Sequence, residues 1–98
     1  MAPQEECGLI VRFGSYAMGI DRMAAEQVER ILAAGPGVKE ISRSSTGREG
    51  EYGLCVKATS QQAAASLFAR IKSSLPANPR GPITVKAGSL RYAVPRKR

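Results

Sequence analysis

The sequence predicts a single α+β domain whose elements follow the order βαββαβ, and three observations predict it. Two segments carry apolar residues at helical spacing, and short runs rich in β-forming residues lie on either side of each segment. The length of 98 residues suffices for one domain but not for two. We therefore expect one domain over residues 1–98, with flexible tails at residues 1–7 and 95–98.

The first half of the chain is expected to form strand, helix and strand in turn. Residues 8–13 are rich in β-forming side chains and predict the first strand. Asp21 is the expected N-cap of a helix that the Gly-Pro-Gly at residues 35–37 stops. The apolar stripe of this helix consists of Ala24, Val28, Ile31 and Leu32. The second strand begins at Val38 and is expected to fade into the polar segment 42–47.

The second half repeats the same order. The alternation in residues 52–58 predicts a third strand with one buried face, and Thr59 or Ser60 caps the second helix. Residues 83–86 predict the fourth strand, and residues 90–94 are a candidate for a short fifth strand. The predicted core residues of this half are Tyr52, Leu54, Val56, Ala64, Leu67, Phe68 and Ile71.

Two strand–helix–strand units joined by a hairpin are typical of the ferredoxin-like sandwich. In that topology a four-stranded antiparallel sheet has the order 4-1-3-2, with both helices on one face. An extra C-terminal strand is possible in addition to these four. The face opposite the helices is expected to be open to solvent or to a partner.

Positive charge is distributed very unevenly along the chain. Residues 1–51 hold six basic and eight acidic side chains, whereas residues 52–98 hold nine basic side chains and no Asp or Glu. The net charge of +7 therefore comes from the second half. Such asymmetry is typical of a protein with an anionic partner, although solvated surface charge is the alternative explanation.

The residue inventory argues against catalysis. The chain contains no His, which removes the commonest general base and the commonest zinc ligand together. No Gly-rich phosphate-binding motif occurs, and two separate cysteines do not make a zinc site. We therefore expect a binding protein that is not an enzyme and that uses neither a cofactor nor a metal.

The two cysteines, Cys7 and Cys55, are expected to be free thiols. On neighbouring antiparallel strands their offset would be about three residues at roughly 3.4 Å each, which exceeds the short Cα separation of a disulfide. Residues 1–6 lack the features of a secretory signal, and no apolar run approaches the roughly 20 residues of a membrane span. These features predict a cytoplasmic protein without membrane contact.

Strand alternation places Arg12, Lys57 and Lys86 on the open face of three adjacent strands. They would form a cationic band across the sheet, and staggered solvated side chains are the alternative interpretation. The polar segment 42–48, with its hydroxyls and two Arg, is either a second phosphate contact or a mobile hairpin tip. The complete set of candidate anion- or partner-binding residues is Arg12, Arg43, Arg48, Lys57, Lys86, Arg91, Arg96, Lys97 and Arg98.

RNA-recognition motifs use the open face of a sheet with this topology. Their third-strand signature aligns best with residues 51–57, where only Tyr52-Gly53 agrees. Leu54 and Lys57 stand at the positions of stacking aromatics, and alternation turns Tyr52 toward the core. Base stacking is therefore not expected, whereas contact with phosphates is.

Two classes of function fit these features. The first is a module that binds nucleic-acid phosphates through a cationic surface with little sequence readout. The second is a protein-interaction module, such as a small inhibitor, an adaptor or an assembly subunit. It would dock on an acidic protein surface or pair through an edge strand, including into a homodimer. A small-molecule domain ranks third because the sequence nominates no convergent polar pocket. We favour the first class by a narrow margin.

Overall fold

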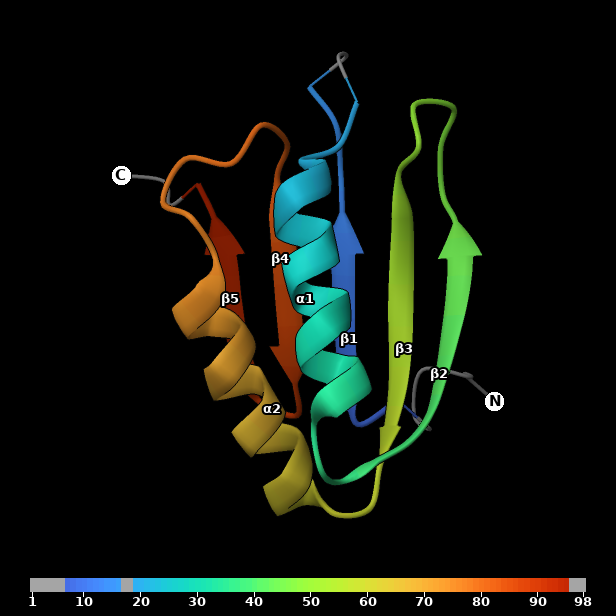
Figure 1. The fold of residues 1–98 in the computed structure, drawn as a ribbon, viewed down its shortest axis with the longest axis vertical. Coiled ribbons are helices and arrows are strands. Elements are labelled where there is room, and N and C mark those ends of the chain that lie inside the picture. The colour runs from blue at the N-terminus through green and yellow to red at the C-terminus, as the bar shows by residue number, and fades with distance from the viewer. Residues whose placement is uncertain (1–6, 17–18, 96–98) are drawn as a thin grey trace.

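The computed structural model describes residues 7–16 and 19–95, so most of the two expected tails lies outside the described residues. Its strands are β1 (Leu9–Phe13), β2 (Val38–Ser45), β3 (Tyr52–Ala58), β4 (Ile83–Ala87) and β5 (Leu90–Val94). Its helices are α1 (Arg22–Ala34) and α2 (Gln61–Ser74). The strands form one antiparallel sheet in the order β2-β3-β1-β4-β5 (Figure 1). The predicted α+β class and the order of the first four strands are confirmed, and the fifth strand lies beside β4.

Both helices lie against the same face of the sheet (Figure 1). Successive side chains of a strand point to opposite faces, so β1 buries Leu9, Val11 and Phe13 under the helices and leaves Arg12 exposed. The predicted helical stripes are buried, except that Ile31 is only partly covered. Apart from Tyr52 with its hydroxyl, no polar or charged side chain is buried within the described part of the chain. The core is therefore almost entirely apolar.

Both helices begin at the side-chain caps that the sequence indicates. An Asp21 oxygen accepts a hydrogen bond from the Ala24 N–H at 3.1 Å, and its other oxygen accepts one from the Arg80 N–H at 2.9 Å. Of the two candidates for the second cap, Ser60 takes the position and accepts from the Ala63 N–H at 3.0 Å. Neither of these helices is long and apolar enough to cross a membrane, and the described residues contain no other.

Strand β2 is longer than the sequence predicted. It runs through the hydroxyl-rich segment and pairs with β3 up to Ser45, which lies opposite Tyr52. The backbone of this segment finds its hydrogen-bond partners on β3, so the pairing outweighs the weak strand preference of its side chains. As a result Ser42 and Ser44 occupy defined positions in the sheet.

Cys7 and Cys55 form a disulfide, so the prediction of two free thiols is wrong. Ile10 pairs with Cys55, and a straight extension of β1 would place residue 7 opposite Ala58, three positions away. The chain instead bends at Gly8 and brings the Cys7 Cα to 5.3 Å from that of Cys55. A structural disulfide fits an oxidising, extracellular environment better than the cytoplasm expected from the sequence.

Candidate functional site

Two rows of residues in register cross the sheet face opposite the helices, which we call the open face. The first row contains, from β2 to β5, Ser42, Cys55, Ile10, Lys86 and Arg91. The second row contains, in the same order, Ser44, Gly53, Arg12, Thr84 and Ala93. Opposed residues of antiparallel strands have Cβ atoms about 4.5–5.5 Å apart, so the side chains within each row are neighbours.

Three basic residues, Arg12, Lys86 and Arg91, form a cationic cluster on the β1–β4–β5 part of the open face. Lys86 lies directly opposite Arg91, and Arg12 lies on the next strand in the second row. All three are exposed and border a hollow of ≈ 580 Å³. Strands β1, β4 and β5 contain no Asp or Glu, and none of the three cations forms an ion pair with a described residue. Because like charges in opposed positions destabilise a sheet, an anionic ligand would relieve a cost that is built into the strands.

Lys57 is not next to this cluster, although the sequence grouped it with Arg12 and Lys86. It lies opposite Glu40, and the Lys57 ammonium is 3.6 Å from a Glu40 carboxylate oxygen. Lys57 is four residues along β3 from Gly53, the residue that lies opposite Arg12, which corresponds to about 13 Å along the strand. The charge of Lys57 is therefore matched locally by Glu40. The basic residue next to Lys86 is Arg91, which lies directly opposite it on β5.

Arg43, another candidate residue, points to the helix side of the sheet. Its guanidinium carbon lies 4.0 Å from the centre of the Tyr52 ring, and a guanidinium nitrogen lies 3.9 Å from a Glu29 carboxylate oxygen. The Tyr52 hydroxyl donates a hydrogen bond to the same Glu29 oxygen. Arg43 is thus part of a polar contact between α1, β2 and β3 that does not reach the open face.

The burial of Tyr52 raises the pKa of its hydroxyl well above the ordinary value of 10, and the hydrogen bond to Glu29 raises the pKa further. The folded state therefore holds this proton more tightly than the unfolded state does. The contribution of Tyr52 to the free energy of unfolding is therefore constant below about pH 10, and it falls as the pH rises above this value. We expect Tyr52→Phe to make this alkaline loss shallower.

Urea denaturation between about pH 8 and pH 11 measures this loss. Tyr16→Phe is the control, because Tyr16 is 57% exposed and is not part of the hydrophobic core cluster. Equal alkaline slopes in the wild type and in Tyr52→Phe would contradict the prediction.

Four predicted site residues remain. Arg48 is exposed in the β2–β3 hairpin. Arg96, Lys97 and Arg98 lie outside the described residues. Of the nine candidates, Arg12, Lys86 and Arg91 border one hollow of the open face, and Arg12 and Lys57 both line a second hollow of that face.

The position of the hydroxyls of residues 42–46 opposite Arg12 is not expected from the sequence, because their polar composition predicts a loop. In the structure Ser44, Gly53 and Arg12 stand side by side in the second row. The alternation of Ser42, Ser44 and Thr46 is the sequence pattern that could have shown that these hydroxyls share one face of a strand. Using it would have meant extending the second strand through a segment whose polar composition is typical of a hairpin loop.

Among residues 7–16 and 19–95, no group of three or more His, Cys, Asp or Glu residues is placed to hold a metal ion. Comparisons of the chain with models of protein families, with curated proteins and with solved structures each return no significant match. The chemistry of the open face therefore carries the functional interpretation.

Proposed function

We propose that this protein is a binding module that holds the phosphates of a nucleic acid on the open face of its sheet. The observation that carries the proposal is the cationic cluster, in which Arg12, Lys86 and Arg91 meet on three adjacent strands that contain no acidic residue. Basic side chains gathered on one face are the electrostatic footprint of phosphate binding.

The side chains of the open face favour phosphates over bases as the groups contacted. Sheets that read bases stack them on aromatic side chains. Here Phe13, Tyr52 and Tyr92 all point to the helix side, and the two rows of the open face contain no aromatic residue. Binding would therefore be largely independent of base sequence.

The proposal fits a ferredoxin-like sandwich extended by one edge strand. The βαββαβ order and the inner strand order β2-β3-β1-β4 support this fold, in which two helices cover one face and leave the other for a partner. The added strand β5 enlarges the open face and supplies Arg91. The Cys7–Cys55 disulfide implies that the nucleic acid would be met in an oxidising environment.

The test is binding to a labelled single-stranded oligonucleotide at several salt concentrations, measured by fluorescence anisotropy. For three cation–phosphate contacts the logarithm of the association constant should fall with the logarithm of the salt concentration with a slope of about −2. Oligonucleotides of unrelated sequence should bind alike. The absence of binding to any DNA or RNA at low salt would overturn the proposal and would leave an acidic protein surface as the partner to test.

A further inference from the structure

A second hollow of the open face has a volume of ≈ 460 Å³. It lies over β3, between side chains of β1 and side chains of β2. Its lining includes Arg12 on one side and Ser42, Ser44 and Thr46 on the other, and Lys57 of β3 is a second basic residue of the lining. Gly53 lies between the two sides, because it pairs with Arg12 on β1 and with Ser44 on β2. Arg12 therefore faces Ser44 across a residue that has no side chain, whereas Ser42 lies opposite Cys55, whose disulfide with Cys7 also lines the hollow.

The three hydroxyls of this hollow are available to a ligand. No hydrogen bond joins the hydroxyls of Ser42, Ser44 and Thr46 to another described residue. The three residues alternate along the chain, so β2 presents Ser42 and Ser44 on the open face, and Thr46 follows at the rim. Each hydroxyl can donate one hydrogen bond.

Gly53 leaves the hollow without a side chain between Arg12 and Ser44. A Cβ atom built on Gly53 would lie 3.6 Å from the Arg12 Cγ and 3.5 Å from the Val11 carbonyl oxygen, which are ordinary contact distances. The backbone conformation of Gly53 is one that other residues adopt, so the strand itself does not require glycine here. Glycine in a strand often marks a place where a ligand approaches closely.

We propose that this hollow is a seat for a single phosphate group, held between the Arg12 guanidinium and the hydroxyls of Ser42 and Ser44. A guanidinium matches the geometry of phosphate oxygens with two parallel N–H donors, and the hydroxyls supply donors from the opposite side. The inference rests on the proposed function, because Arg12 belongs to both surfaces. It adds a defined position for one phosphate beside the cationic cluster.

The test uses inorganic phosphate as the probe and follows backbone amide shifts by nuclear magnetic resonance at constant ionic strength. We expect saturable shifts centred on residues 12, 44 and 53. Gly53→Val should weaken phosphate binding roughly tenfold or more, because the branched side chain fills the hollow and removes charge-assisted hydrogen bonds. The same change should leave the thermal midpoint unchanged or raise it, because valine suits a strand better than glycine.

A second variant keeps the test independent of crowding around Arg12. Ser42→Ala combined with Ser44→Ala should weaken phosphate binding by a similar factor, whereas Ser89→Ala, which removes a hydroxyl outside the hollow, should not. Unchanged phosphate affinity in Gly53→Val and in the double Ser variant would overturn the seat. Amide shifts spread over the whole surface would overturn it as well.

Oligonucleotides with and without a 5′-phosphate separate the two sources of the phosphate group. A gain in affinity from the 5′-phosphate that Gly53→Val abolishes assigns the seat to a terminal phosphate. Equal losses for both oligonucleotides in that variant assign it to the phosphodiester chain. If phosphate binds in the hollow but no oligonucleotide binds at low salt, the proposed function fails while the seat stands. If oligonucleotides bind and Gly53→Val changes nothing, the seat fails alone.

Discussion

Reduction of the Cys7–Cys55 disulfide is expected to lower the free energy of unfolding by about 4 kcal/mol, which is the value for a closed loop of this length in the chain-entropy model. The two cysteines are separated by 48 residues, so the cross-link excludes many extended conformations of the unfolded chain. A loss of this size corresponds to a fall in the thermal midpoint of roughly 15 °C or more for a domain of this size. A domain of about 100 residues has a total stability of only about 5–15 kcal/mol, so reduction would remove a large part of it.

Thermal denaturation with and without a phosphine reductant measures this change. The double variant Cys7→Ser, Cys55→Ser should have the midpoint of the reduced wild type, and reductant should not change it further. This variant separates the loss of the cross-link from other effects of the reductant. Identical midpoints for the oxidised and the reduced wild type would show that the cross-link contributes nothing to stability.

Neutralising the cationic cluster is expected to weaken binding to single-stranded nucleic acid on the order of a hundredfold at low salt, or about 1 kcal/mol for each of three charges. The variant is Arg12→Gln, Lys86→Gln and Arg91→Gln in one chain. Because it also removes the repulsion between the opposed Lys86 and Arg91, we expect the thermal midpoint to stay the same or to rise. Lower affinity without lower stability would be the mark of a binding surface.

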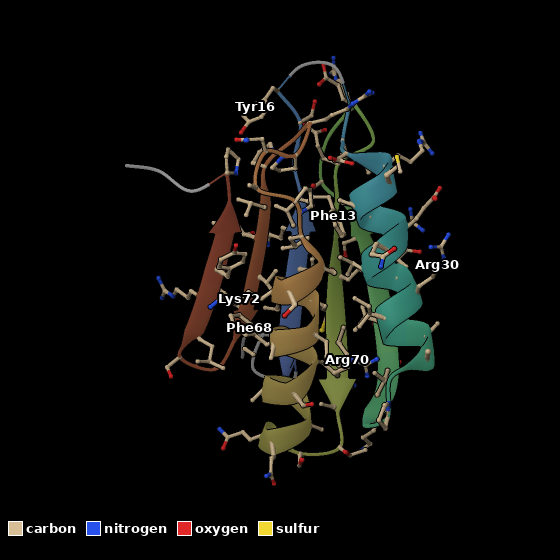
Figure 2. All side chains as sticks on the ribbon, turned by 60° about the vertical axis from the view of Figure 1, so that its left-hand side comes forward. Phe13, Tyr16, Arg30, Phe68, Arg70 and Lys72 are labelled. Atoms are coloured by element: carbon tan, nitrogen blue, oxygen red, sulfur yellow. A yellow bond between two sulfur atoms is a disulfide. The ribbon has the colours of Figure 1, made fainter. Side chains whose placement is uncertain are left out.

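The matched control removes three positive charges elsewhere, with Arg30→Gln, Lys39→Gln and Arg70→Gln. All three are exposed, and Figure 2 shows Arg30 projecting from α1 on the side away from the sheet. Both variants carry the same net charge, so a general electrostatic effect would weaken binding equally in the two. An equal loss in the control would contradict a localised site, and anisotropy titrations of the two variants side by side decide the question.

Local periodicity explains why the elements could be predicted. The stripes of α1 and α2 and the alternation of β3 follow from the 3.6- and two-residue periods of the two structures, and the caps at Asp21 and Ser60 follow from short-range hydrogen bonds. The prediction was less accurate where a distant partner determined the outcome. Residues 42–45 read as a loop by composition, and their pairing with β3 makes them strand.

In the candidate site, too, the features that depend on one strand were predicted correctly, and those that depend on two strands were not. Alternation correctly placed Arg12 and Lys86 on the open face, because it depends only on each strand. The neighbours of each side chain depend on register, which is a property of two strands together. Register sets Lys57 beside Glu40 and Lys86 beside Arg91, and the position of Arg43 on the helix side gives it Glu29 and Tyr52 as partners.

The sequence by itself determined the class of fold, the order of the elements, the buried stripes and the unequal distribution of charge. The tertiary structure alone decided that Cys7 meets Cys55, because the bend at Gly8 lies outside the regular geometry of β1. It also decided which cations share a surface and which are matched by an acid. The physical reason is that periodic patterns depend on neighbours along the chain, whereas a bond or a charged cluster depends on atoms that only the folded register brings together.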